Sequence, residues 1–411
     1  MTSRPASSGT APAIAVCEQD ITKASGPIGV AAGAGWARVL LRAGRAPLAW
    51  VTVGAAEGTV TGEAIARVLV DVAPALARGA VHARQAAAEA TREPPVSVVI
   101  CTRDRPNSLA RCLDSIAQID YPEFEVVIVD NAPSTDAARR LASSHDFRYV
   151  EEPIPGLDWA RNRGIATATH EIIAFTDDDV RVDRLWLQGI ARAFTGDAIG
   201  LVTGFVAPGS LDTEAEQQFE LFYGGMSKGF APHTLHPATA EPWRLISTQH
   251  LGVGANMAIR RTALAQIDGF DTALDVGTPS HGGGDLDLFH RVLLAGWSAH
   301  YEPSAIVWHF HRTTRAGLRR QMYDNGRAFG TYLLVRLRDG RLPRREIAGA
   351  MVKWISWLIG RIPRRFLRRE RMPLPYIAAE LWGAIHAPFA YLATYARDRR
   401  LRRRSLLERT Q

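Results

Sequence analysis

Residues 172–180 read "IIAFTDDDV", an apolar run that ends in three consecutive aspartates, Asp177, Asp178 and Asp179. A short apolar run bounded by polar residues predicts a buried strand. Neighbouring carboxylates repel one another, and burying them without partners is unfavourable. A divalent cation would neutralise them, and carboxylate oxygens suit Mg²⁺ or Mn²⁺. The segment therefore predicts a metal site at the end of a buried strand; a solvated acidic turn is the alternative.

The chain before this segment alternates apolar runs with stretches of helical spacing. The predicted strands are 96–102, 124–132 and 148–153, and the predicted helices are 108–119, 135–144 and 158–169. Strands that alternate with helices of about 10–15 residues indicate an α/β fold, with a mostly parallel sheet covered by helices on both faces.

Polar residues follow two of these strands. Thr102, Arg103 and Asp104 end the first, and Asp130 and Asn131 end the second. Ligands of such sheets bind outside the carboxyl ends of the strands. We therefore expect these side chains and the aspartate triplet to line one crevice.

The positive charge of the chain is concentrated near its carboxyl end. The net charge is +7, and residues 340–411 contribute +12 (17 Lys and Arg against 5 Asp and Glu), so residues 1–339 carry −5. Affinity for anionic partners is therefore expected of the tail. Nucleic acid is not an expected partner, because the arginine runs lack interleaved base-stacking aromatics and a known binding fold.

The three cysteines show neither metal-ligand nor disulfide spacing. The first 16 residues lack a charged region followed by an apolar core, which predicts no secretory signal. Reduced cysteines and a cytoplasmic location are expected.

The composition divides the chain into four parts. Residues 1–20 are predicted to be a flexible amino terminus, and 21–92 a small accessory domain with a linker. In that domain, 36–53 reads as two strands around the turn "AGRA" and 61–77 as a helix, a ββα unit. The main domain is predicted over 93–335, followed by a basic, partly amphipathic helical region over 336–411.

Seven segments carry a family likeness. In chain order they read "VSVVICTRDRP", "FEVVIVDNAPS", "PGLDWARNRGIATA", "IIAFTDDDVRVD", "GANMAIRR", "IDGFD" and "GGGDLDLFHRVLLAGW". Together they make residues 95–335 resemble the family 2 glycosyltransferases with the GT-A fold, a Rossmann-like mixed sheet. The resemblance implies inverting transfer of a sugar from a nucleotide diphosphate donor, with Mn²⁺ or Mg²⁺ as cofactor.

The resemblance also implies roles for individual residues. Asp179 and then Asp177 would contact the metal, with Asp178 turned to the ribose. Asp130 would accept a hydrogen bond from the base, and Arg161 would approach the nucleotide or the diphosphate. The remaining nucleotide contacts would come from Thr102, Arg103, Asp104 and Asn131.

Asp285 matches the family's catalytic base, which takes the proton of the acceptor hydroxyl. The family usually has a Glu-Asp pair here, but this chain has Gly284 before Asp285. That change affects how the acceptor is held. Asp287 is expected to serve only as a helix N-terminal charge. The glycine-rich loop 275–284 is expected to close over the donor, or else to be a variable surface loop.

Another predicted strand ends in "AIVWHFHR". Some GT-A enzymes use a histidine from this region as a further metal ligand, and His309 is the candidate here. A hydrogen-bonded structural histidine is the alternative.

Two apolar segments of the tail, 347–360 and 374–396, each precede an arginine-rich run. Glu380 within the second is unlike a membrane span. We predict helices that lie in a membrane interface, with arginines against anionic lipid. A helical hairpin that covers the sheet is the alternative.

The predicted function is metal-dependent transfer of a sugar from a UDP- or dTDP-sugar to a hydroxyl of a lipid-linked or cell-envelope glycan, at the cytoplasmic face of the membrane. A non-catalytic, sugar-nucleotide-binding or scaffold relative is the alternative that Gly284 leaves open. A nucleotidyltransferase is disfavoured, because "CTRDRPNS" after the first strand lacks the glycines of a phosphate loop.

Overall fold

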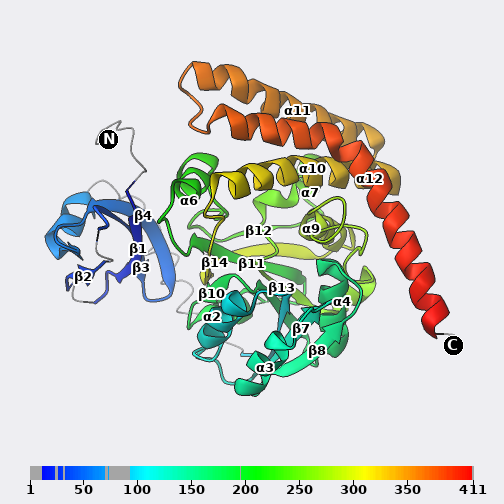
Figure 1. The fold of residues 1–411 in the computed structure, drawn as a ribbon, viewed down its shortest axis with the longest axis horizontal. Coiled ribbons are helices and arrows are strands. Elements are labelled where there is room, and N and C mark those ends of the chain that lie inside the picture. Colours follow the sequence, from blue (N-terminus) through cyan, green and yellow to red (C-terminus); the bar gives the residue numbers. More distant parts are fainter. Residues whose placement is uncertain are drawn as a thin grey trace.

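A mixed sheet runs through the main domain of the protein (Figure 1). The computed structural model describes residues 12–23, 26–30, 33–69, 73, 93–194 and 196–409. The strands of this sheet are β6 (Val96–Thr102), β7 (Phe124–Asn131), β8 (Arg148–Glu152), β9 (Ile172–Asp177), β10 (Val180–Val182), β11 (Ile199–Pro208), β12 (His233–Leu235), β13 (Asn256–Arg260) and β14 (Ser298–His309). Their order is β10-β14-β11-β13-β9-β6-β7-β8, and β12 pairs with β14.

The parallel half of the sheet, β9-β6-β7-β8, holds the predicted strands. Every residue of β6 is buried, as expected of a strand covered on both faces. Strand β13 runs antiparallel to β9 and β11, so the sheet is mixed. The prediction of a mostly parallel sheet with helices on both faces is confirmed, and two apolar clusters fill the two faces.

Helices surround this sheet. They are α2 (Pro106–Ile116), α3 (Ala137–Ser144), α4 (Leu157–Thr167), α5 (Trp186–Ala193), α6 (Glu214–Gln218), α7 (Pro242–Ile246), α8 (Arg261–Gln266) and α9 (Gly284–Leu294). Helix α4 packs directly on β6, because a Cβ atom at Gly164 would lie 2.3 Å from Cγ1 of Val99. This close contact fixes the start of α4 beside the carboxyl ends of the strands.

The amino-terminal unit contains more strands than the sequence predicted. They are β1 (Ile14–Asp20), β2 (Ile28–Gly29), β3 (Trp36–Ala43), β4 (Ala46–Gly54) and β5 (Thr59–Val60). Strands β3 and β4 are the predicted antiparallel pair. Strand β1 lies parallel to β3, so the expectation of a flexible terminus over 1–20 is wrong from Ile14 onward. The predicted helix is described at 62–69 and 73, whereas residues 1–11 and the linker 80–92 lie outside the described residues.

This unit is fastened to the main domain by packing and by one buried ion pair. Leu40 packs with Trp308 of β14, and Trp50 meets the Trp308 ring edge to face at 6.3 Å. Next to them, Nη1 of Arg42 lies 2.6 Å from Oδ2 of Asp183, with both side chains 9% exposed.

Arg42→Ala should therefore lower the free energy of unfolding by about 3–5 kcal/mol, because it leaves Asp183 as an unpaired buried carboxylate. Urea unfolding measures the change. Arg67→Ala is the control, since Arg67 pairs with Glu63 on the surface with side chains 80% and 86% exposed. Equal stability of the Arg42 variant and the control would contradict this account of the docking.

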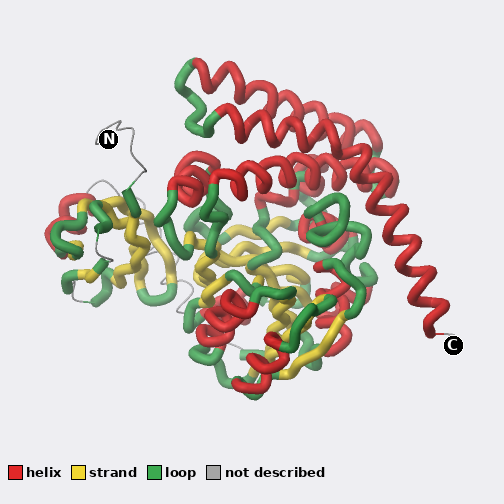
Figure 2. The backbone as a smooth tube through the Cα atoms, viewed as in Figure 1, coloured by secondary structure: helices red, strands yellow, loops and turns green. Residues whose placement is uncertain are grey.

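Long helices stack above the sheet in the view of Figure 2. They are α10 (Arg315–Asp339), α11 (Arg344–Phe366) and α12 (Leu374–Arg409). Helix α10 runs without a break past residue 335, so the domain boundary predicted there is wrong. No helix in the described part of the chain is both long enough and apolar enough to cross a membrane.

Helices α10 and α12 touch backbone to backbone. A Cβ atom at Gly326 or at Gly383 would lie 1.9 Å from a carbonyl oxygen of the other helix, so only glycine allows this approach. Glu380 explains the carboxylate within an apolar segment: it faces inward, where Arg361 Nη1 donates to it at 2.6 Å and Tyr223 Oη at 3.1 Å. The predicted hairpin that covers the main domain is therefore present.

Candidate active site

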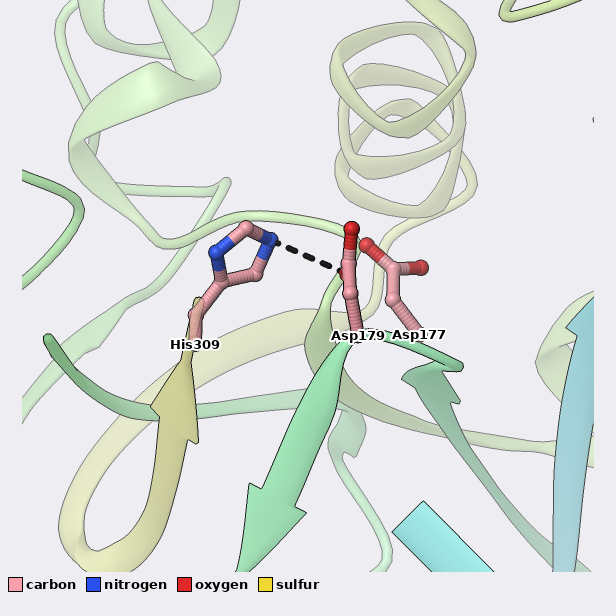
Figure 3. Close-up of side chains that lie close together, drawn as sticks. All are labelled: Asp177, Asp179 and His309. Atoms are coloured by element: carbon pink, nitrogen blue, oxygen red, sulfur yellow. Dashed lines mark ion pairs between the residues drawn. The ribbon is translucent and has the colours of Figure 1, made fainter. Parts of the chain in front are cut away.

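The aspartate triplet lies at the turn between β9 and β10. Strand β10 pairs antiparallel with β14, and Val180 is opposite His309. This register places Asp179 beside His309, with 3.3 Å between Oδ1 and Nε2. Asp177 points to the same place (Figure 3), and the three ligand atoms lie within 4.8 Å of one another.

These three side chains fit a divalent cation. Burial, together with the charge of Asp179, raises the pKa of Asp177 to about 7, so Asp177 lacks sufficient positive charge nearby. Burial lowers the pKa of His309 to about 4, which leaves a neutral imidazole able to act as a ligand. Asp179 Oδ1 and His309 Nδ1 have no hydrogen-bond partner.

The side chain of Asp178 is bound within the protein. That side chain is fully buried, and its Oδ2 accepts from Thr102 Oγ1 at 2.7 Å. Thr102 and Asp178 are therefore hydrogen-bonded to each other, and their contacts with a nucleotide remain predictions. Arg105, which the sequence analysis overlooked, lies 2.5 Å from Asp178 and 2.9 Å from Asp179. Its only sequence signal is a second arginine in "TRDRP".

At the end of β7, Asp130 and Asn131 behave differently. Asp130 Oδ2 accepts from Tyr149 Oη at 3.0 Å, while its buried Oδ1 has no hydrogen-bond partner among the described residues. The amide of Asn131 is used internally: it donates to Ile154 O at 2.8 Å and accepts from Gly156 N at 2.8 Å. Asn131 thus shapes the loop before α4, and its contact with a nucleotide remains a prediction.

Arg103 and Asp104 lie on the exposed turn after β6. Asp104 has φ +52° and accepts from Ser134 N at 2.9 Å and from Ser134 Oγ at 2.7 Å. These bonds join the turns after β6 and β7. Arg103 remains a predicted nucleotide contact.

Arg161 of α4 is buried beneath the triplet. Its Nη1 donates to Asp158 at 3.1 Å and also to Asp275, and its Nη2 lies 4.0 Å from Asp177 Oδ1. The guanidinium also lies 5.1 Å from the centre of the Phe270 ring. Asp158 and Asp275 were not predicted as site residues, although Asp158 lies in the segment "PGLDWARNRGIATA" and Asp275 begins the glycine-rich loop 275–284.

Asp285 lies in the first turn of α9 and lines the same cavity as Asp177. Its Oδ2 accepts from Gly254 N at 2.9 Å and its Oδ1 from Leu286 N at 2.8 Å. Burial and the charge of Asp275 raise its pKa, which makes it a stronger base.

Asp287 is more than a helix N-terminal charge. It is fully buried, accepts from Arg291 Nε at 2.6 Å and pairs with Arg336 of α10. It therefore ties α9 to the first carboxy-terminal helix.

The glycine-rich loop 275–284 is held in place by hydrogen bonds. Thr278 and Ser280 form hydrogen bonds within the loop, and Val276 O accepts from Leu157 N at 3.0 Å. The loop therefore differs from an open flap.

One cavity of about 920 Å³ extends from the aspartate triplet to the carboxy-terminal helices. It is lined by Asp177, Arg161 and Asp285, and also by Trp354 and Trp357 of α11. Lys228 also lines it; burial lowers the pKa of this lysine, while the charge of Asp285 opposes the shift. The helices that the sequence predicted as a tail thus complete the site.

Comparison with known proteins agrees with this geometry. Residues 97–267 match the model of the glycosyl transferase family 2. The match covers 171 of the 411 residues, so the likeness to this family rests on the main domain. A pre-mycofactocin glycosyltransferase of Mycobacterium tuberculosis is 27% identical over 300 residues, which cover 72% of this chain and 58% of that protein. A glycosyltransferase of Haloferax volcanii is 24% identical over 284 residues, or 66% of this chain and 82% of that protein.

The fold of this glycosyltransferase domain is GT-A. A mannosyltransferase from Pyrobaculum calidifontis, solved with GDP-Man and Mn²⁺, superposes with a TM-score of 0.50 and 19% identity. The superposition covers 75% of this chain and 92% of that one. The predicted family and fold class are confirmed, while the chain spans 58% of the length of the mycobacterial relative.

Mn²⁺ binding should tighten as the pH rises from 5 to 7 and then level off. A bound cation requires Asp177 in its charged form, and the pKa of this carboxyl is raised to about 7. Below that pH a proton competes, so affinity should fall by about tenfold per pH unit. His309 stays neutral throughout this range. Calorimetric titration at four pH values tests this, and Asp177→Asn should remove the slope; a flat profile in the wild type would contradict it.

Proposed function

We propose that the protein is an inverting, divalent-metal-dependent glycosyltransferase. Its donor would be a UDP- or dTDP-sugar, and its acceptor a hydroxyl of a lipid-linked or cell-envelope glycan. The observation that carries this proposal is the grouping of Asp177, Asp179 and His309 in the cavity region that also contains Asp285. The relatives are named as glycosyltransferases.

The protein would perform three tasks in one displacement. Asp177, Asp179 and His309 would hold the cation, which offsets charge gained by the leaving diphosphate. The unpaired Oδ1 of Asp130 would accept from the base of the donor. Asp285 would take the proton of the acceptor hydroxyl, from the side of the cavity opposite the leaving group, as inversion requires.

The acceptor would enter along α11. Trp354 and Trp357 provide flat apolar surfaces on the outer wall of the cavity, and Gln321 and Asn325 of α10 provide hydrogen-bonding groups near them. Such a wall suits a molecule with sugar rings, which bind through both kinds of contact.

Asp285→Asn should separate an enzyme from a non-catalytic binder. Loss of the base should lower sugar transfer at least about a hundredfold while donor binding with Mn²⁺ stays near normal, because the base acts only in the transition state. Asp179→Asn should instead weaken both. Donor turnover and calorimetric UDP binding measure the two properties. Wild-type rates from Asp285→Asn would place the base elsewhere. Donor binding by the wild type without any turnover would favour the binder.

The outer face of α11 and α12 favours a location at the cytoplasmic membrane face. Of the fifteen large apolar residues exposed in the described part of the chain, eleven lie between residues 352 and 392. Trp382, Ile385 and Phe389 are 56%, 59% and 69% exposed on one side of α12. The tail contributes net positive charge beside them. An apolar face flanked by arginines suits an anionic lipid surface.

Replacing Trp382, Ile385 and Phe389 together by glutamine should reduce binding to vesicles of 70% phosphatidylcholine and 30% phosphatidylglycerol at least fivefold. The reason is the loss of about 1.5–3 kcal/mol per inserted side chain. Cosedimentation measures binding, and added salt should weaken it in the wild type. Trp36→Gln on the amino-terminal unit, where Trp36 is 41% exposed, is the control. Unchanged sedimentation of the triple variant would remove the membrane proposal.

A further inference from the structure

Gly284 begins α9 at the position where the family likeness led us to expect glutamate. A Cβ atom on Gly284 would lie 2.2 Å from Oδ2 of Asp158 and 2.9 Å from Oδ2 of Asp275. A protein interior does not tolerate such contacts without rearrangement. The space beside Gly284 is therefore occupied by two carboxyl groups from other segments.

Both carboxyls bind the same guanidinium nitrogen. Asp158, in the first turn of α4, accepts from Arg161 Nη1 at 3.1 Å through Oδ1, and Asp275, in the loop before α9, accepts from the same nitrogen through Oδ2. Asp158 is 1% exposed, whereas Asp275 borders the cavity. Asp275 is held in place by its own turn, since its Oδ1 accepts from Val276 N at 2.8 Å.

The surroundings of Asp158 disfavour its charged form. Burial and the adjacent charge of Asp275 raise the pKa of Asp158 well above its ordinary value. Its Oδ2, which accepts no hydrogen bond, is then the natural place for the proton. Asp275 supplies the negative charge that pairs with Arg161.

Arg161 in turn lies between the two halves of the site. Its Nη2 is 4.0 Å from Asp177 Oδ1, at the outer limit of an ion pair and too far for a hydrogen bond. A Cβ atom on Gly254 would meet this Nη2 at 2.7 Å and Asp285 Cβ at 3.3 Å, so Arg161 and the base face each other across one glycine. An Arg161 without its anchor could close on Asp177 and compete with a cation for that carboxylate.

We propose that Asp275 is a positioning residue that takes the place of a carboxylate at residue 284. It holds Arg161 back from Asp177 and so leaves this carboxylate available to the cation. The inference rests on the metal site of the proposed function and adds a residue to it from a different segment of the chain.

Binding of Mn²⁺ alone, measured calorimetrically at pH 7.5, tests the proposal without any sugar transfer. Asp275→Asn should weaken Mn²⁺ binding at least tenfold. Asp158→Asn should change it less than threefold, because the raised pKa of Asp158 favours the uncharged form that asparagine resembles. Asp268→Asn is the matched control, since Asp268 is an exposed aspartate that also has positive φ, +56°. Wild-type affinity in Asp275→Asn would overturn the proposal.

A double variant tests whether Asp275 acts by positioning Arg161 or only by keeping its loop folded. Adding Arg161→Gln to Asp275→Asn removes the competing cation and should restore Mn²⁺ affinity to within about threefold of the Arg161→Gln variant alone. A double variant as weak as Asp275→Asn would mean that Asp275 acts only through the loop, and would also overturn the proposal. A wild type that binds Mn²⁺ but turns over no nucleotide sugar would count against the proposed function alone.

The lack of space for a side chain at residue 284 can be tested separately. Gly284→Ala should lower the Tm, and Asp158→Ala should relieve much of that loss, so the double variant should lose less than the sum of the single losses. Additive losses would show that the space beside Gly284 is free, which would contradict the replacement of a side chain at that position.

Discussion

Charge compensation of the carboxylates at the strand ends is the constraint on which the active site depends. Asp177, Asp178 and Asp179 follow one another at a buried turn, where unpaired negative charge is strongly unfavourable. Two arginines supply part of the compensating positive charge. Arg105 lies beside Asp178 and Asp179, and Arg161 lies near Asp177. The remaining deficit of positive charge raises the pKa of Asp177, and under the proposed function it would give a cation its affinity.

The carboxy-terminal helices are part of the site rather than an appendage. Glycines at the crossing of α10 and α12 bring the two backbones into contact, and Asp287 ties α9 to α10 through Arg336. The far part of α12 reaches the loop that carries Asp275, because Tyr395 Oη donates to Asp271 at 2.7 Å. The same helices present aromatic side chains to the cavity on one face and to solvent on the other. Acceptor binding and attachment to a membrane would thus share one element.

Motif matching located the site residues but not the direction of each side chain. Thr102, Asp178 and Asn131 occupy the expected positions, yet all three are turned inward and make hydrogen bonds within the protein. Their role is to fix the turns that carry Asp130 and Asp179. Burial and partner choice are set by neighbouring strands, which a motif of a few residues does not describe.

The sequence by itself determined the parallel sheet, the aspartates at its edge and the domain family, because apolar runs, helical spacing and motif order are local properties of the chain. The tertiary structure alone decided what surrounds them. Asp275 reaches Arg161 across 114 positions, and the aromatic residues of α11 face Asp285 from the far end of the chain. These contacts depend on how helices and loops pack, and their residue types carry no signal until the packing brings them together.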